Sequence, residues 1–244
     1  MGALGHYLEE EGIATVGISL IRPQTENTKP PRALWVPFEL GRPFGPPTDR
    51  RFQRRVLLAA LQLLERGEGP AIIEDFAEDD PRAHPDPAWR PPVVPPANGD
   101  VRDGNILAAR LEAEIADLRD AHRRWIGQRG RTTVGVSGLA ISDAGTYVAE
   151  WVRGRSPKSP RDGYSAPLLM RFAVDDLKAY HLEAAAAGSA GPSSRQLGDW
   201  FWQDSAAGAA LHALRDICLA SDDERLKLIA GNFIVPTARV RATG

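Results

Sequence analysis

The spacing of apolar residues divides the chain into two parts that are built differently. Up to about residue 76, short apolar runs alternate with helical repeats. This pattern predicts a helix over residues 4–11, strands over 13–21 and 33–38, and an amphipathic helix over 50–66. Beyond residue 104 the repeat is almost entirely helical. The predicted fold is therefore an α/β N-terminal unit, a Rossmann-like fragment with parallel strands, followed by a mainly α-helical C-terminal domain.

The segment between these parts favours neither helix nor sheet. Residues 74–80 are mostly acidic, and seven prolines follow between Pro81 and Pro96. Such proline-rich segments are extended and semi-rigid. We predict an α/β unit over residues 1–76, a linker over 77–103 and a helical domain over 104–244. Two interpretations of the linker stay open: it lies along a neighbouring surface through Trp89, Val93 and Val94, or it is a disordered spacer.

In the helical part the clearest repeat covers residues 104–126 and predicts one long helix, with His122 on its apolar stripe. A short strand is expected over residues 133–136. The three prolines of residues 22–31 predict a loop there. Capping residues and periodicity predict the remaining helices over 142–152, 175–187 and 222–230, from Ser193 or Ser194 through 202, and from Asp204 or Ser205 through 219.

Composition limits the compartment and the classes of partner. The 244 residues carry 30 basic and 32 acidic side chains, a net charge of −2, which argues against a nucleic-acid partner held by bulk electrostatics. The single cysteine, Cys218, excludes an internal disulfide and a multi-cysteine zinc site, which suits a reducing cytoplasm. No apolar run approaches the roughly 20 residues of a membrane span, and the acidic start does not resemble a signal peptide. With an Arg, Ala, Gly and Pro content typical of GC-rich bacteria, the sequence predicts a cytoplasmic bacterial protein without membrane contact.

Motifs for metals, cofactors and covalent catalysis are not found in the sequence. The five histidines are scattered singly, and Asp176 and His181 are five residues apart, a poor spacing for one helical face. Nucleotide-binding glycine motifs and a Gly-x-Ser-x-Gly elbow are missing. His122 is expected to be a core histidine and Cys218 a small buried thiol. We therefore predict no metal and no cofactor, and the sequence identifies no catalytic residues.

The stretch over residues 32–48 has the pattern of a strand, a shaped loop and the start of a helix. Its prolines and glycines end the strand, and such loops at strand ends are where α/β folds bind ligands. One interpretation makes it a substrate-binding loop for a small carboxylate; the other makes it a stiff surface connection. The candidate binding residues are Arg32, Glu39, Gly41, Arg42 and Gly45.

Three consecutive aromatic residues, Trp200, Phe201 and Trp202, lie within a predicted helix. Neighbouring side chains on a helix point about 100° apart, so all three cannot face one core. The preferred interpretation is that at least one of them contributes to a partner interface or a pocket, and the alternative is an irregular corner of the core.

Residues 5–76 resemble a known family. The matching pieces are His-Tyr-Leu-Glu-Glu-Glu-Gly-Ile-Ala-Thr-Val at 6–16 and Pro-Arg-Ala-Leu-Trp-Val-Pro-Phe-Glu-Leu-Gly-Arg-Pro-Phe-Gly-Pro-Pro at 31–47. They are similar to the C-terminal part of the selenoprotein B subunit of the glycine, betaine and sarcosine reductases and their D-proline reductase relatives. In that family a selenocysteine or cysteine upstream of this region reduces the substrate. Only four residues precede it here, and Cys218 lies near the other end, so this chain is not expected to perform that chemistry alone.

The resemblance implies a non-redox subunit of a heteromeric reductase-like enzyme that acts on a small amino acid or carboxylate. A partner chain would carry the redox cysteine or selenocysteine, and this chain would complete the fold and the substrate pocket. The alternative is a non-catalytic interaction or scaffold protein derived from that family. A third interpretation, an independent enzyme with a cofactor in the helical domain, has no motif behind it. A small α/β piece would expose a sheet edge, so a homo- or hetero-oligomer is expected.

Overall fold

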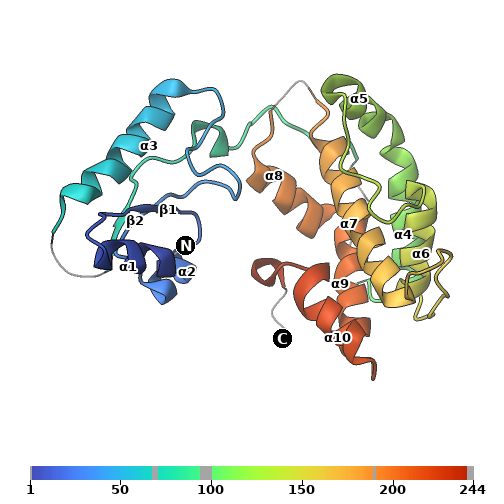
Figure 1. Ribbon diagram of the computed structural model, residues 1–244. Coiled ribbons are helices and arrows are strands. Elements are labelled where there is room, and N and C mark those ends of the chain that lie inside the picture. Colours follow the sequence, from blue (N-terminus) through green and yellow to red (C-terminus); the bar gives the residue numbers. More distant parts are fainter. Residues whose placement is uncertain (1, 68–70, 94–100, 189–190, 241–244) are drawn as a thin grey trace. The chain divides into compact units, whose positions relative to one another are not determined.

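The chain forms two compact units, Met1–His84 and Pro85–Gly244. The computed structural model describes residues 2–67, 71–93, 101–188 and 191–240 (Figure 1). The first unit is a small α/β structure with a parallel sheet and the second is helical, so the protein is mainly helical, with a small α/β part. Among the described residues, no helix has the length and apolar character needed to cross a bilayer.

The boundary between the two units falls within the predicted linker, residues 77–103. Its residues up to His84 belong to the first unit and those from Pro85 onward to the second. In the second unit, Trp89 donates a hydrogen bond from its indole N–H to the carbonyl oxygen of Ala185 at 3.2 Å, and Val93 packs against the core. The Asp86 amide donates to the Gln196 side chain at 2.7 Å. These contacts agree with the interpretation that this part of the segment lies along a surface. Val94 lies outside the described residues.

Three short parallel strands form the sheet of the first unit, in the order β1-β2-β3. They are β1 (Gly17–Ser19), β2 (Arg32–Trp35) and β3 (Ile72–Asp75). Gly17 is opposite Ala33, and Arg32 is opposite Ile72. The parallel arrangement was predicted, but both predicted strands are longer than the observed ones. The first is shortened because the Thr15 amide donates to the Glu9 side chain instead of to a neighbouring strand.

Helices cover both faces of this sheet (Figure 1). On one face α3 (Arg50–Gln62), continued by a 3₁₀ turn over Leu63–Glu65, buries its apolar side against β2. On the other side lie α1 (Gly2–Glu10) and α2 (Arg22–Thr28). The core between α3 and the sheet contains Leu34, Val36, Phe38, Phe52, Val56, Ala60 and Leu63.

Helix α2 corrects the predicted loop over residues 22–31. Pro23 is in the first turn of α2, where a backbone N–H has no partner within the helix, so proline is tolerated there. The helix ends at Lys29, which adopts a left-handed conformation with φ of 44°. Arg22 and Thr25 then contact the sheet, because Arg22 lies over the Trp35 ring and Thr25 is hydrogen-bonded to Ser19.

Two glycines in the loop between β2 and α3 adopt backbone angles that other residues disfavour, and the strand ends before them, as predicted. Gly41 and Gly45 have φ values of 89° and 76°, a region that side chains disfavour. Asp49 then caps α3, accepting a hydrogen bond from the Phe52 amide at 3.0 Å. A β-carbon at Gly45 would lie 2.5 Å from the Phe52 ring, whereas one at Gly41 would meet nothing within 4 Å.

We therefore expect Gly45→Ala to destabilise the first unit by about 2–4 kcal/mol, through backbone strain and overpacking together. The control is Gly41→Ala, which should cost only about 1 kcal/mol because strain acts there alone. Thermal or chemical denaturation of both variants measures the difference. Equal losses would contradict the close contact with Phe52.

The second unit is a bundle of helices around one hydrophobic core (Figure 1). The long helix α7 packs against α5 and α6, while α4 packs against α6 and α9. The helices are α4 (Gly104–Asp117), α5 (Arg119–Arg129), α6 (Ile141–Val152), α7 (Ala166–Ala185), α8 (Ser194–Asp199), α9 (Ala206–Leu219) and α10 (Glu224–Ile229).

Several helix boundaries differ from the predicted ones because of contacts with distant residues. The helix predicted over 104–126 bends at Leu118, so that α4 packs on α6 and α9 while α5 packs on α7. The helix predicted over 175–187 begins already at Ala166, with a proline in its first turn. The strand predicted over 133–136 is a loop. Of the alternative caps predicted for α8 and α9, Ser193 and Ser205 are the ones observed, and Asp223 caps α10 in place of its neighbour Asp222.

The aromatic run lies in a π-helical turn, Trp200–Asp204, and does not form an exposed surface. Trp200 and Phe201 are buried, with 3% and 1% of their surface exposed, and Trp202 is half-buried against Phe201 and His212. The turn closes with a bond from the Ser205 amide to the Trp200 carbonyl at 3.0 Å, five residues back. This wider turn lets two adjacent aromatics enter the core, which corrects the expectation of a partner interface at Trp200 and Phe201. Trp202 instead lines a hollow of about 320 Å³ together with His212 and Arg239, which agrees with the pocket interpretation for this residue.

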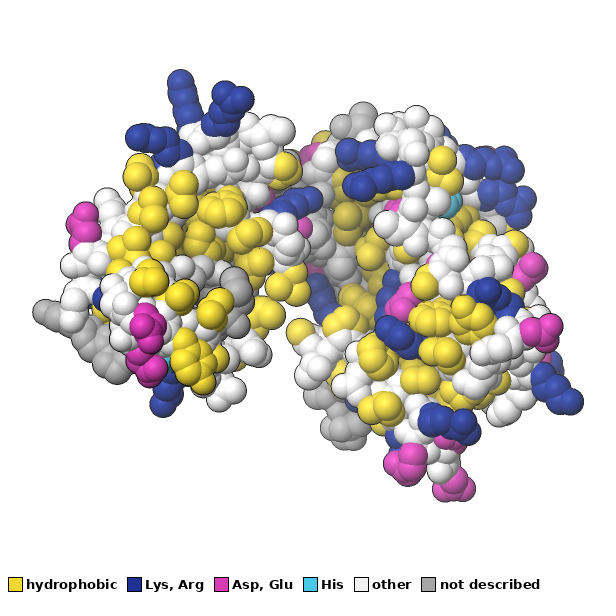
Figure 2. Space-filling model, viewed as in Figure 1, with side chains coloured by type: hydrophobic (Ala, Val, Ile, Leu, Met, Phe, Trp, Pro, Cys, Tyr) yellow, Lys and Arg dark blue, Asp and Glu magenta, His cyan; other side chains and the backbone are white. Residues whose placement is uncertain are grey.

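Apolar side chains are also present on the outer surface of the first unit (Figure 2). Three of them are leucines of α3, Leu57, Leu58 and Leu61, each more than 40% exposed. They lie on the side of the helix opposite the residues that pack on the sheet.

Candidate functional site

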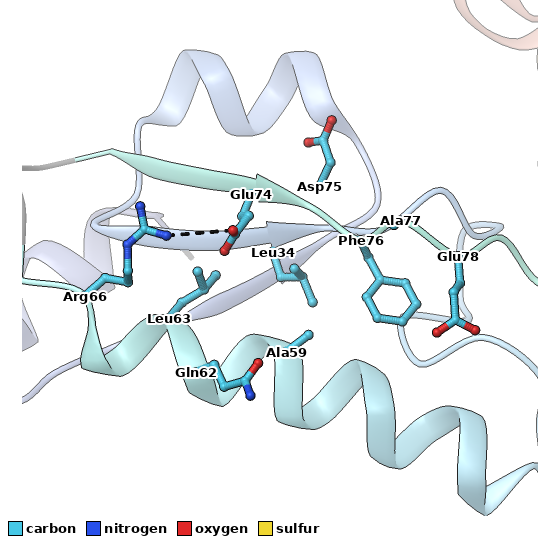
Figure 3. Close-up of a pocket in the computed structure, with 10 residues that line it drawn as sticks. All are labelled: Leu34, Ala59, Gln62, Leu63, Arg66, Glu74, Asp75, Phe76, Ala77 and Glu78. Atoms are coloured by element: carbon cyan, nitrogen blue, oxygen red, sulfur yellow. Dashed lines mark ion pairs between the residues drawn. The ribbon is translucent and has the colours of Figure 1, made fainter.

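A cavity of about 430 Å³ lies between α3 and the outer strand β3 (Figure 3). Its floor is apolar and is formed by Leu34, Ala59, Leu63 and Phe76. Alternation along β3 places Glu74 and Phe76 on the α3 side of the sheet, where the Phe76 ring packs edge-on against Phe52 of α3 and Glu74 stays exposed. The remaining lining residues are Gln62, Arg66, Glu74, Asp75, Ala77 and Glu78.

The outer edge of β3 beside this cavity is open. The amides of Ile72 and Phe76 donate to Pro31 and Trp35 on the β2 side, at 3.1 and 2.8 Å. By alternation in the parallel pair with β2, the amides of Ile73 and Asp75 point away from β2 toward the edge of the sheet, where β3 has no neighbouring strand among the described residues. An open edge of this kind accepts an added strand.

The polar rim of the cavity pairs each acid with an arginine. Arg66 lies 3.7 Å from Glu74, and Arg55 donates to Glu78 at 2.7 and 2.9 Å. The hydrogen bonds from Arg55 hold the pKa of the Glu78 carboxyl below its usual value. Asp75 is paired with Arg22 on the other face. The arrangement can accept an apolar group at its floor and hydrogen-bonding groups at its rim.

The structure does not bring the predicted residues Arg32 and Arg42 together. Arg32 begins β2 and is nearly covered, donating to Glu9 at 2.5 Å and to the Arg66 carbonyl at 2.9 Å. The same contact lowers the pKa of Glu9. Arg42 lies beyond the other end of β2, where it approaches Glu39 at 3.6 Å. The expectation of one pocket shared by both guanidinium groups is thus corrected, and Arg32 has a structural role.

Glu39, Gly41, Arg42 and Gly45 do lie together in one loop at the carboxyl end of β2. The loop leads to a shallow hollow of about 540 Å³ at the start of α3. None of the five predicted binding residues lines that hollow, which is formed by Pro46, Pro47, Thr48, Asp49, Arg50, Arg51 and Pro81. The loop therefore positions the start of α3.

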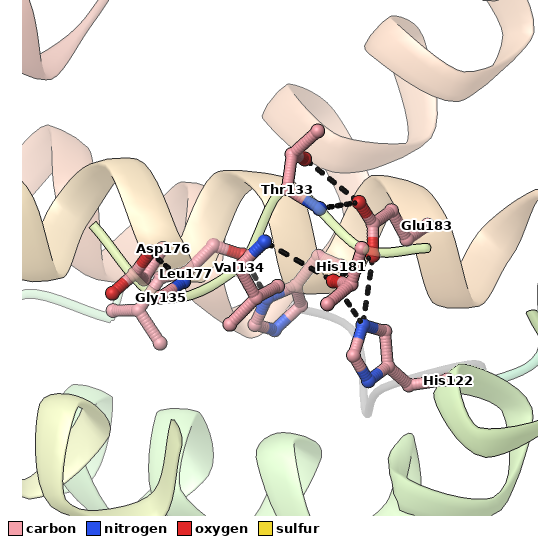
Figure 4. Close-up of polar contacts among 9 residues, drawn as sticks. His122, Thr133, Val134, Gly135, Asp176, Leu177, His181 and Glu183 are labelled. Atoms are coloured by element: carbon pink, nitrogen blue, oxygen red, sulfur yellow. Dashed lines mark hydrogen bonds and ion pairs between the residues drawn. The ribbon is translucent and has the colours of Figure 1, made fainter. Parts of the chain in front are cut away.

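In the helical unit, two buried carboxylates of α7 hold the loop that precedes α6 (Figure 4). Asp176 accepts bonds from the Gly135, Val136 and Ser137 amides at 2.6 to 2.9 Å, and from the Ser137 hydroxyl. Seven residues later, Glu183 accepts bonds from Thr132, Thr133 and His122. The spacing of seven places both carboxylates on one face of α7. These groups are occupied in holding the loop.

A third buried carboxylate, Glu114 of α4, lies at the start of α9. It accepts hydrogen bonds from the Ala206 and Ala207 amides, each at 2.9 Å. His181 is fully buried, donates from Nδ1 to the Leu177 carbonyl at 2.7 Å, and places Nε2 3.2 Å from Glu114.

Asp176 and His181 have different partners: Asp176 holds the loop before α6, and His181 contacts Leu177 and Glu114. Groups of three or more His, Cys, Asp or Glu suited to a metal are not found among the described residues. Glu114 was missed as a site residue. Its position within the apolar stripe of the predicted helix over 104–126, between Leu111 and Ile115, was the available signal, because a buried glutamate needs partners.

Cys218 is 1% exposed on α9, and burial raises the pKa of its thiol to about 11. The reactive form of cysteine is the thiolate, so this thiol is not suited to redox chemistry or nucleophilic attack. The sequence prediction of a buried thiol is confirmed.

Comparisons with known proteins found no similar protein. No family model matches the chain, and neither the curated proteins nor the solved structures gave a match. The resemblance of residues 5–76 to the selenoprotein B subunits therefore stays a prediction.

Proposed function

We propose that this chain is a non-redox subunit of a heteromeric, reductase-like enzyme that acts on a small amino acid or carboxylate. In this proposal the first unit is a fragment of a Rossmann-like fold. A partner chain adds a strand to the outer edge of β3 and supplies the reactive cysteine or selenocysteine. The substrate pocket then forms between the partner and the cavity beside α3.

The observation that carries the proposal is the open edge of β3 next to an apolar cavity. Three strands are few for a parallel sheet, which usually has both faces and both edges protected. An added strand would pair with the outward amides of Ile73 and Asp75 and would place alternate side chains toward the cavity floor at Leu34 and Leu63.

The cysteine content supports a partner that brings the thiol. Cys218 is the only cysteine, and it is buried with a raised pKa. Arg42 of the β2–α3 loop does not line this cavity, but its side chain is exposed, so a substrate carboxylate that extends beyond the cavity could reach it once a partner is bound. Arginine suits that task because its planar fork donates two hydrogen bonds.

Partner capture tests the proposal. Tagged full-length protein should co-purify from its native cells with one major chain that contains a reactive cysteine or selenocysteine, identified by mass spectrometry. Asp75→Pro removes an outward amide of β3 and the ion pair with Arg22, and should reduce capture at least tenfold. Asp75→Ala removes the same ion pair with Arg22 but keeps the outward amide, so it is the matched control and should retain capture.

The outcomes separate the candidate functions. Recovery of a thiol-bearing chain through the β3 edge supports the subunit. A specific partner without a reactive thiol, lost in the same variant, supports the alternative of a non-catalytic scaffold. Capture that Asp75→Pro leaves unchanged, while the variant stays folded, contradicts the role of the edge.

A further inference from the structure

The outer face of α3 changes in character along the helix axis. Its N-terminal half exposes Arg50, Arg51 and Arg54, and the middle exposes three leucines. Figure 2 shows this order, with cationic side chains over the N-terminal end of α3 and apolar ones further along. An exposed acid, Glu65, follows the leucines in the 3₁₀ turn.

This apolar stretch is unusual for a helix that already buries its other side. Leu57, Leu58 and Leu61 are 44%, 41% and 44% exposed, and Leu61 adjoins both of the others because it lies four residues after Leu57 and three after Leu58. The opposite side of α3, with Phe52 and Val56, fills the core. Contiguous exposed apolar patches usually mark interaction surfaces.

The charges at the two ends of the patch are free to bind a partner. Arg55 is paired with Glu78, but Arg50, Arg51 and Arg54 form no ion pair with any residue that the structure describes, and neither does Glu65. One end of the patch is therefore positive and the other carries a negative charge. A complementary surface would be negative, apolar and positive in the same direction.

A second copy of α3 offers that complementary surface when it runs antiparallel. We propose that the outer face of α3 is a homodimer interface with a two-fold axis midway between Leu58 and Leu61. Leu58 of each copy then packs against Leu61 of the other. Arg54 lies four residues before Leu58, and Glu65 lies four residues after Leu61, each about 6 Å along the axis. Arg54 of each copy therefore meets Glu65 of the other, twice in one symmetric interface.

The interface consists of one helix face and is at the small end of specific interfaces, so a dissociation constant in the micromolar range is expected. It lies on the outer side of α3 and leaves the open edge of β3 free. The dimer is thus independent of the proposed partner strand, and either can fail without the other.

Sedimentation of the full-length chain between about 1 and 100 µM tests the dimer. The expected mass rises with concentration toward twice the 26.5 kDa of one chain. The double variant Leu58→Ser, Leu61→Ser should remain monomeric over this range. Leu4→Ser on α1, where the leucine is 57% exposed, removes a comparable apolar side chain elsewhere and should leave the dimer intact.

Charge reversal tests the antiparallel register. Arg54→Glu or Glu65→Arg alone should weaken self-association about tenfold, because like charges then face each other twice. The double variant should restore it, and an equimolar mixture of the two single variants should form a heterodimer more readily than either associates alone. A monomer at 100 µM, a dimer that persists in the double leucine variant, or the absence of charge rescue would overturn the proposal.

Discussion

Replacing Glu114 by alanine is expected to lower the free energy of unfolding of the helical unit by about 3–5 kcal/mol. Glu114 is 4% exposed and accepts hydrogen bonds from the first two amides of α9 while it faces His181. Alanine would leave these buried donors without an acceptor, and each such group costs about 1–3 kcal/mol. Chemical denaturation, followed by circular dichroism, measures the loss.

Two further variants identify the cause. Asp117→Ala removes an exposed acid from the same helix and should change stability by less than about 0.5 kcal/mol. Glu114→Gln keeps one oxygen that can accept a bond, so its loss should lie between those of the other two variants. A large loss for Asp117→Ala, or a negligible one for Glu114→Ala, would contradict the role of this carboxylate as the acceptor for α9.

Glu183→Gln is expected to be the second most destabilising change, by about 2–4 kcal/mol at neutral pH. Glu183 accepts bonds from Thr132, Thr133 and His122 and so holds the loop before α6. Burial raises the pKa of its carboxyl, but the hydrogen bonds from these partners outweigh burial, and the pKa lies below the ordinary 4.5.

The sign of the pH dependence follows from this lowered pKa. The unfolded chain binds the proton more readily than the folded one, so the ionised Glu183 stabilises the fold above about pH 4.5. That contribution is lost as the pH falls through the lower, folded-state pKa. The difference between the wild type and Glu183→Gln should therefore be constant from pH 7 to about 5 and shrink below about pH 4.

Glu150 provides the control for this measurement. The pKa of its carboxyl is also lowered, chiefly by the hydrogen bond from Arg155, but the pair lies at the surface. Glu150→Gln should have a much smaller effect, and added salt should remove it. A Glu183 effect that is equally sensitive to salt, or that persists unchanged at pH 3, would contradict the buried network.

The buried acids that hold the helical unit together show why only part of the site could be predicted from the sequence. Asp176, Glu183 and Glu114 each bind groups from 39 to 93 positions away. The apolar pattern places each of them on a helix, but nothing local indicates which loop or helix end it will contact. Their roles depend on how α4, α7 and α9 pack.

In the first unit, the positions of Arg32 and Arg42 also could not be predicted from local sequence. Both lie in the stretch that combines a strand and a shaped loop, and nearness in sequence suggested a shared pocket. The strand carries them to opposite ends, and Glu9 of α1 meets Arg32 there. The open edge of β3 and the cavity beside it exist only once β3 has paired with β2.

By itself the sequence determined what depends on neighbours within a few residues. This includes the division into an α/β part and a helical part, the amphipathic α3, the approximate starts of α8 and α9, and the glycines that end the strand before α3. Periodicity, capping and glycine conformation are local properties, so they can be inferred without a fold. The tertiary structure alone decided the bend at Leu118, the π-helical turn that buries Trp200 and Phe201, and the partners of the buried acids. These features depend on side chains and backbone groups of elements far apart in the chain, which come into contact only when the elements pack.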